Sequence, residues 1–302
     1  MGKQPPKRTI VQTKMEAAIV RPYKEGKPVT GHKSFNWVQR ADNKQWVHAY
    51  NSPEFIRDTL GTPLVQNLRT TGQSKKIVVD FCGGEGLVTD VLQQFLKSQG
   101  INATVINSDL SERNLGRHRK QNPEGVVVRA DSAKAPYAPN SLDAATVRYG
   151  IHYFSKKAQS QLMKEIYKAV KPGGVVIVYH PHHQSTFVPH VKAMAAAAGM
   201  SYAERRTQNY FPTEEEFARM TSKVGFEVSD PQVVAEHWYS PESYADRWGG
   251  DNKEKRREIQ KKVKRIFDKA ASQKKYAEEF KRQGKRILKP GHHIMFILRK
   301  PE

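Results

Sequence analysis

Cysteine is nearly absent from this sequence, and long apolar runs are missing altogether. The only cysteine among the 302 residues is Cys82, which excludes an intramolecular disulfide and any metal site built on several thiolates. This usage is typical of a reducing compartment. No apolar run approaches the roughly 20 residues of a membrane-spanning helix, and residues 1–21 lack the apolar segment of a secretory signal. We therefore expect a cytoplasmic location, with a mitochondrial one as the alternative because no acidic residue precedes Glu16.

Acidic residues are also scarce, and the imbalance is uneven along the chain. There are 30 Asp/Glu against 51 Lys/Arg, a net charge of +21. Residues 1–50 hold 10 Lys/Arg and 3 Asp/Glu, and residues 251–302 hold 18 and 7, whereas the 200 residues between them hold 23 and 20. Basic flanks of this kind indicate an anionic partner, such as RNA or an anionic membrane surface, or else a solvated lysine-rich surface.

The middle of the chain alternates short apolar runs with helical patterns. Lys76–Phe81 is a continuous apolar run typical of a buried parallel strand, and Leu87–Ser98 then places its apolar residues on one helical face. The alternation continues to a last strand at Ile294–Leu298. This order predicts an α/β fold, a doubly wound seven-stranded Rossmann-like sheet with the last strand antiparallel. The other predicted strands are 103–107, 126–129, 142–147, 175–179 and one that begins at 226, and the other predicted helices are 52–68, 112–122, 156–170, 189–198 and 214–224.

Composition divides the chain into four parts. We expect a basic N-terminal arm or lid over residues 1–50, a core over 51–236, a basic helical insertion over 237–289 and a final core strand over 290–302. Within the insertion, apolar residues at helical spacing predict one long helix from about Asn252 to Gln283. In this topology, an insertion before the last strand lies over the mouth of the site, so it is expected to act as a lid.

The turn after the first strand carries the strongest motif. It reads Cys82-Gly83-Gly84-Glu85-Gly86 and lies between a strand and a helix, where glycine allows a ligand to approach the backbone. The dinucleotide spacing G-x-G-x-x-G is absent, and Glu85 would repel a pyrophosphate. Asp80, at the end of the strand, suits a ligand with a cationic end. The turn therefore favours S-adenosylmethionine (SAM) over a nicotinamide dinucleotide.

Two more acidic residues follow the next two strands. Asp109 ends the second strand, where a carboxylate can accept both ribose hydroxyls. Asp131 follows the third strand, with Ser132 beside it, and could bond the adenine amino group. A single Asp at such a place is usually a helix N-cap. Three acids at successive strand ends after one glycine-rich turn favour a ligand.

With these motifs the sequence resembles the class I SAM-dependent methyltransferases, over about residues 75–230 and the last strand. The segments that carry the resemblance are VVDFCGGEG, VINSDLS, RADSAKAPYAPNSLDAATVRYGIHYF, KAVKPGGVVIVYH and FPTEEEFARMTSKVGFE. Within that group, Cys82 and the stretch ATVRYGIHYF are similar to the ubiquinone/menaquinone-biosynthesis C-methyltransferases. The pair His152-Tyr153 departs from that branch, which usually carries Arg-Asn there.

The resemblance implies roles for residues along the cofactor. Asp80, Gly84 and Gly86 would lie along the methionine part of SAM, near Cys82. Asp109, with its neighbour Leu110, would hold the ribose. The remaining cofactor residues that it implies are Asp131 and Ser132 at the adenine, and Arg148 and Tyr149 beside the methyl donor.

Candidate catalytic residues lie at the carboxyl ends of the fourth and fifth strands, where open α/β sheets bind substrate. They are His152, Tyr153 and His180. The segment HPHHQSTFVPH invites a metal interpretation, but no carboxylate or thiolate accompanies its histidines, and neighbours on an extended segment point apart. We therefore predict no metal.

These observations favour an enzyme, a SAM-dependent methyltransferase acting on a small, quinone-like or other aromatic, lipophilic acceptor. The fourth strand is not followed by the Asn/Asp-Pro-Pro-Tyr/Phe motif of the amino methylases of adenine and cytosine. Two alternatives stay open: an RNA-directed methyltransferase that uses the basic flanks, and a binding or assembly protein that keeps the methyltransferase fold.

Overall fold

A computed structural model describes most of the chain from residue 51 onward. The described residues are 51–69, 74–182, 188–197, 199, 210–242, 252–273, 280–283 and 286–302. The arm predicted over residues 1–50, His183 and the aromatic residues Tyr244 and Trp248 lie outside them.

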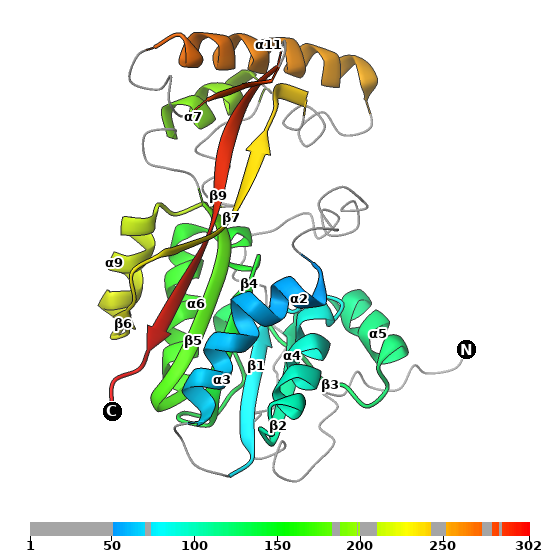
Figure 1. The fold of residues 1–302 in the computed structure, drawn as a ribbon, viewed down its shortest axis with the longest axis vertical. Helices are drawn as coiled ribbons and strands as arrows, with labels where there is room; N and C mark the ends of the chain where they lie inside the picture. Colours follow the sequence, from blue (N-terminus) through cyan, green and yellow to red (C-terminus); the bar gives the residue numbers. More distant parts are fainter. Residues whose placement is uncertain are drawn as a thin grey trace, which may run out of the picture.

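The core is a parallel sheet with one antiparallel member (Figure 1). Its central path has the order β3-β2-β1-β4-β5-β9-β6, and β9 runs antiparallel to β5. The strand order changes direction between β1 and β4, which creates the switch point at which such sheets bind ligands. The predicted doubly wound sheet with an antiparallel last strand is confirmed. The strands are β1 (Lys76–Phe81), β2 (Ala103–Asp109), β3 (Val126–Arg129), β4 (Leu142–Arg148), β5 (Val170–His182), β6 (Glu227–Val228) and β9 (Arg286–Arg299).

Helices cover both faces of this sheet, as the continuous burial of β1 requires. On one face α6 (Lys156–Ala169) and α9 (Glu214–Val224) pack against side chains such as Val79 and Val178. On the other face α2 (Pro53–Ile56), α3 (Thr62–Leu68) and α4 (Leu87–Ser98) pack against Val78 and Ile177. Helix α5 (Glu112–Gln121) lies beside β2 and β3.

The helix predicted over residues 52–68 is interrupted by a π-helical turn at Arg57–Gly61. Gly61 lies in that turn against α4, and a Cβ there would come within 2.5 Å of the Phe95 ring. The close approach of two helices explains why a glycine is tolerated inside this one.

Beyond the core, β9 continues into a smaller lobe, which is made of β7 (Gln232–Tyr239), β8 (Lys281–Gln283), α7 (Val188–Ala197), α11 (Lys253–Ala271) and the N-terminal part of β9 (Figure 1). There β9 pairs with β7 and β8, two strands that the sequence did not predict. Helices α7 and α11 complete this lobe. β7 and β9 run across residues 237 and 289, the boundaries predicted for the insertion.

The long helix predicted over residues 252–283 is wrong at its C-terminal end, where Lys281–Gln283 form strand β8. Helix α11 ends at Ala271. Its buried face carries Ile259, Val263 and Phe267, and Phe280 returns to lie with its ring centroid 5.6 Å from that of Phe267. On one straight helix, 13 residues would place them about 20 Å apart. The contact between these two rings therefore shows that Phe280 does not continue the helix, although its spacing in the sequence fits the helical periodicity. Within the described residues, no helix is both long and apolar enough to cross a membrane.

Candidate functional site

The turn after β1 has the backbone of a ligand cradle. Gly84 and Gly86 both adopt positive φ, at 58° and 87°, a region that L side chains rarely adopt. A Cβ on Gly86 would lie 2.3 Å from the ring of His118 on α5, so only glycine fits at this position. A Cβ on Gly84 would meet nothing within 4 Å. Gly84 therefore presents bare backbone to open space, as a surface on which a ligand can lie.

The backbone N–H and carbonyl of Gly84 both form hydrogen bonds with side chains of β2. Its N–H donates to Asp109 Oδ2 at 3.0 Å, and its carbonyl accepts from Asn107 Nδ2 at 3.1 Å. Asp109 Oδ1 also accepts from the Ser111 N–H at 2.8 Å. Burial raises the pKa of Asp109, and the backbone donors partly oppose that rise. The second strand end and the turn thus form one rigid unit, with carboxylate lone pairs left to accept ribose hydroxyls.

Asp80 lies beneath the turn as a buried carboxyl group. Thr89 donates to its Oδ2 and Thr146 to its Oδ1, each at 2.9 Å. Burial raises its pKa from 3.8 to about 6, while the two hydroxyl donors and the nearby Arg148 cation lower it. Burial disfavours the charged form of Asp80, and the donors and Arg148 offset this only in part. A second cation, such as the ammonium group of SAM, would therefore stabilise the carboxylate.

The third strand end adds polar groups on the other side of the turn. Asp131 is buried and accepts from the Ala133 N–H at 3.0 Å, so it caps the short helical turn Ser132–Lys134. Ser132 Oγ lies 3.6 Å from Cys82 Sγ. Burial raises the pKa of the Cys82 thiol, which disfavours the thiolate form. Leu110 is half-buried next to Asp109, and its carbonyl accepts from Arg129 Nε at 3.4 Å.

Aromatic rings gather at the ends of β4 and β5. Tyr149 has a positive φ of 51° and its hydroxyl lies 3.1 Å from that of Tyr179 and 2.9 Å from His293 Nδ1. Tyr179 Oη also lies 2.9 Å from that nitrogen. The Arg148 guanidinium lies 4.7 Å from the Tyr149 ring centroid, and it donates to Asn51 Oδ1 at 2.7 Å. Burial lowers the pKa of Arg148.

Sequence reasoning missed Asn51, Asn107, His118, Tyr179 and His293. Only Asn107 left a signal, because a lone amide inside an apolar strand is unusual. The contacts of Tyr179 and His293 depend on the pairing of β5 with β9, in which Tyr179 lies opposite Met295.

Two of the three predicted catalytic residues, His152 and Tyr153, have their rings in contact. His152 is 6% exposed and stacks on Phe211 with ring centroids 4.9 Å apart. The centroid of the Tyr153 ring lies 4.2 Å from that of the His152 ring. His180 is fully buried, between Phe217 and Phe296. Among the described residues, no group of three or more His, Cys, Asp or Glu side chains is arranged to hold a metal ion.

Comparison with known proteins agrees with this geometry. Residues 79–178 match the family model described as a methyltransferase domain. The Ubiquinone/menaquinone biosynthesis C-methyltransferase UbiE of Nitrosospira multiformis is 28% identical over 168 residues, which cover 50% of this chain and 66% of that protein. A demethylmenaquinone methyltransferase of Corynebacterium kroppenstedtii is 35% identical over 103 residues, 33% of this chain and 40% of the relative. The matches thus span less than two thirds of either relative.

Structural comparison supports the same fold. A solved structure described as that of a candidate methyltransferase from Bacillus halodurans superposes with a TM-score of 0.58 at 18% identity, covering 80% of this chain and all of that one. The open face of Gly84, the carboxylate of Asp109 and the buried Asp80 fit the methionine and ribose of SAM. Residues 79–178 therefore match a methyltransferase domain on a Rossmann-like sheet, for which S-adenosylmethionine is the cofactor, and the chain resembles the UbiE C-methyltransferases over about half of its length.

Proposed function

We propose that the chain methylates a small, lipophilic aromatic acceptor of the quinone-precursor kind. The observation that carries this proposal is the cluster of Tyr149, Tyr179 and His293 at the carboxyl ends of β4 and β5. Its rings are within 6 Å of one another, and its polar atoms face each other. Tyr179 and His293 are fully buried and Tyr149 is only partly buried, so Tyr149 is the ring that would offer a flat partner to an aromatic acceptor, with the other two behind it. The names of the two relatives point to the same class of acceptor.

Methyl transfer to an aromatic ring asks the protein for alignment and for proton acceptance. When bound, SAM supplies a methyl group on a positively charged sulfur. A ring carbon becomes a good nucleophile when the neighbouring hydroxyl loses its proton, so a base near that hydroxyl accelerates the reaction. The arrangement of Arg148 beside the two tyrosine rings would stabilise a phenolate in the same region.

We assign the base to His152, with Tyr153 as the group that orients the acceptor. Both lie on the turn Ile151–Tyr153, directly after β4, and their rings are in contact. His180 is a third candidate, and its enclosure by Phe217 and Phe296 suits a positioning role.

A transfer assay with methyl-labelled SAM tests the proposal. We expect label in a reduced, short-chain demethylmenaquinone analogue and in lipid extract, and none in total RNA. His152→Gln is expected to lower kcat by about 10²-fold or more, with little change in the affinity for SAM. Asp109→Ala is the control for cofactor binding and should abolish it. Label in RNA alone, or an unchanged kcat in His152→Gln, would refute the acceptor or the base respectively.

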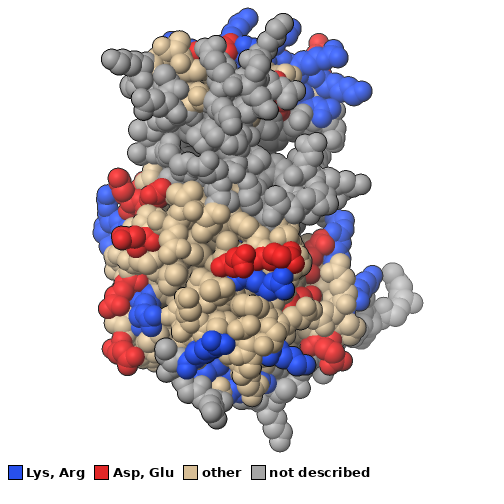
Figure 2. All heavy atoms as spheres, in the orientation of Figure 1, with Lys and Arg blue, Asp and Glu red and all other residues tan. Residues whose placement is uncertain are grey.

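A second candidate, an RNA-directed methyltransferase, is favoured by helix α11. Eight of its Lys/Arg side chains are exposed, against three acidic residues in the whole helix. Two of the eight, Lys262 and Lys264, pair with Glu258 and Asp268 on the same helix. The rest present unbalanced positive charge at the outer end of the lobe (Figure 2). The exposed residues are Lys253, Lys255, Arg257, Lys261, Lys262, Lys264, Arg265 and Lys269.

Salt dependence separates this candidate from the first. If α11 binds RNA, affinity falls steeply with salt, and reversing the charge of Lys261 and Arg265 weakens it. Reversal of the exposed core residues Lys97 and Lys157 is the matched control. Binding to anionic vesicles in place of RNA would assign the helix to a membrane surface. Cofactor binding without transfer to any acceptor would favour an assembly protein.

A further inference from the structure

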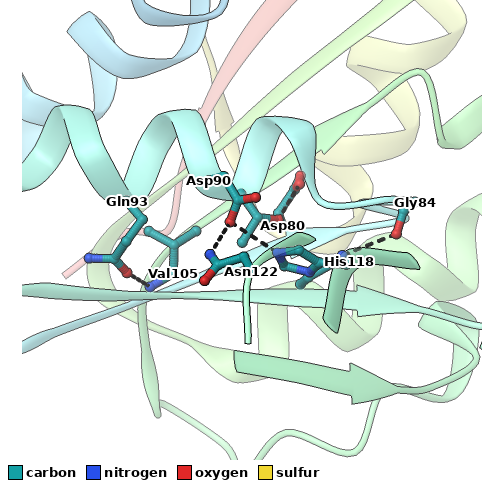
Figure 3. A network of polar contacts seen from close by, with 9 residues as sticks. Asp80, Gly84, Asp90, Gln93, Val105, His118 and Asn122 are labelled. Atoms are coloured by element: carbon teal, nitrogen blue, oxygen red, sulfur yellow. Dashed lines mark hydrogen bonds and ion pairs between the residues drawn. The ribbon is translucent and has the colours of Figure 1, made fainter. Parts of the chain in front are cut away.

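The glycine turn rests on a buried polar network that no role assigned so far uses (Figure 3). At its centre is His118 on α5, which is fully buried. Its ring lies between two glycines, because a Cβ on Gly86 would come within 2.3 Å of it and a Cβ on Gly125 within 3.0 Å. Both ring nitrogens have hydrogen-bond partners in this orientation, whereas a flipped ring would place carbon atoms against them.

Those partners determine the protonation of the ring. The Gly84 carbonyl can only accept, so the Asn107 amide must present its nitrogen to it, at 3.1 Å. The same amide nitrogen lies 2.9 Å from His118 Nδ1, which must then accept. The other ring nitrogen, Nε2, lies 3.0 Å from Asp90 Oδ1, a carboxylate that also accepts from Asn122 Nδ2 at 2.6 Å. These contacts assign the acceptor role to His118 Nδ1 and the donor role to Nε2.

This arrangement forms a continuous relay of hydrogen bonds from α4 to the turn. Asp90 holds the His118 ring, His118 accepts one N–H of Asn107, and Asn107 donates its other N–H to Gly84. Asn107 is fully buried and its Oδ1 has no hydrogen-bond partner among the described residues, so the amide has no alternative orientation that keeps both bonds. The relay sets where the Gly84 carbonyl points.

We propose that His118 is a positioning residue for the cofactor, and that it acts through the acceptor lone pair on Nδ1. This inference concerns the SAM site and is independent of the identity of the methyl acceptor. Loss of the lone pair leaves a buried N–H of Asn107 without a partner and frees the turn that the cofactor contacts. A neutral buried hydrogen bond of this kind corresponds to about a three- to tenfold change in affinity.

Two amides separate the roles of the two ring nitrogens. In His118→Asn the amide oxygen can take the place of Nδ1, which preserves the acceptor for Asn107. In His118→Gln the amide nitrogen can take the place of Nε2, which preserves the donor to Asp90 but removes the acceptor. Dissociation constants for SAM and S-adenosylhomocysteine are measured by calorimetry, with thermal unfolding of each variant without ligand.

We expect His118→Gln to bind both ligands about three- to tenfold more weakly than the wild type. His118→Asn should stay within about twofold of the wild type even if its unfolding temperature falls. Long-range ¹H–¹⁵N correlation of the wild-type imidazole should show an unprotonated Nδ1. Equal affinities for the two variants, or a protonated Nδ1, would overturn the proposal.

Gln93→Ala is the matched structural control. Gln93 also lies on α4 and bridges to β2: it donates to the Ala103 carbonyl at 2.9 Å and accepts from the Val105 N–H at 2.8 Å (Figure 3). It has no bond to the turn, so it should lower the unfolding temperature and leave ligand affinity unchanged. If Gln93→Ala weakens binding as much as His118→Gln, the effect is one of general stability. Should His118→Gln fail to fold, Asn107→Ser decides, because it removes the amide between the ring and Gly84 and must show the same loss.

Discussion

Replacing Gly84 or Gly86 by alanine should separate the two demands that the turn meets. Each substitution places a Cβ on a residue with positive φ, which costs about 1–2 kcal/mol. At Gly84 nothing lies within 4 Å of the new atom, so no further loss of stability follows. At Gly86 the Cβ would lie 2.3 Å from the His118 ring, which two glycines enclose. Overpacking of this kind adds about 1–3 kcal/mol.

We therefore expect Gly86→Ala to have the larger effect on stability and Gly84→Ala the larger effect on cofactor affinity. Gly86→Ala should lose about 2–5 kcal/mol of stability, which corresponds to a fall in unfolding temperature of roughly 4–20 °C for a domain of this size. Gly84→Ala should lose only about 1–2 kcal/mol, yet its new methyl group occupies the surface on which we expect the cofactor to lie. We expect Gly84→Ala to weaken SAM binding by an order of magnitude or more.

Thermal unfolding without ligand and calorimetric titration with S-adenosylhomocysteine measure the two quantities separately. The reasoning is refuted if Gly84→Ala binds the ligand as tightly as the wild type, because the open space above Gly84 would then not be the cofactor surface. It is equally refuted if both variants unfold at the same temperature, because the contact between Gly86 and His118 would then carry no strain.

Three further predictions concern other parts of the molecule. Because native Asp80 binds its proton more tightly than an unfolded aspartate, with pKa about 6 against 3.8, it contributes on the order of 3 kcal/mol below pH 4 that is lost as pH rises to 6. In denaturant titrations, the free energy of unfolding of the wild type should fall by this amount between pH 4 and pH 6, relative to that of Asp80→Asn. The affinity of the wild type for SAM should rise over the same pH range, because the carboxylate forms. Thr213→Ala removes the capping box of α9 and should cost about 1 kcal/mol without changing SAM affinity, as thermal unfolding and calorimetry would check. Tyr149→Phe removes a hydroxyl bonded to Tyr179 and His293, and it should lower kcat for an aromatic acceptor while KM for SAM stays constant. A rise in KM for SAM as large as the fall in kcat would contradict the proposed acceptor site.

Local patterns were sufficient to predict the core fold. Strand β1, the glycine turn and the acids Asp80 and Asp109 are adjacent or nearly adjacent to the elements that place them, so their arrangement follows from the order of strands. The length of α11 was not predictable in the same way. Its apolar spacing continues to Phe280, but the chain folds back so that Phe280 packs on Phe267. Tertiary packing of two aromatic rings outweighs helical periodicity there.

His293 shows why the acceptor side of the site was harder to predict than the cofactor side. It is 144 residues from Tyr149 and 114 from Tyr179, yet its Nδ1 lies 2.9 Å from both hydroxyls. The antiparallel register sets Tyr179 opposite Met295, and His293, two residues earlier on β9, projects from the same face of the strand. β9 also pairs with β7 in the lobe that carries α11. One strand thus joins the lobe to the tyrosines beside the cofactor turn, so a shift of β9 along β5 would move the His293 ring away from both hydroxyls. A one-residue shift would turn His293 to the opposite face of the sheet, which makes the register of β9 a requirement of the site as well as of the fold.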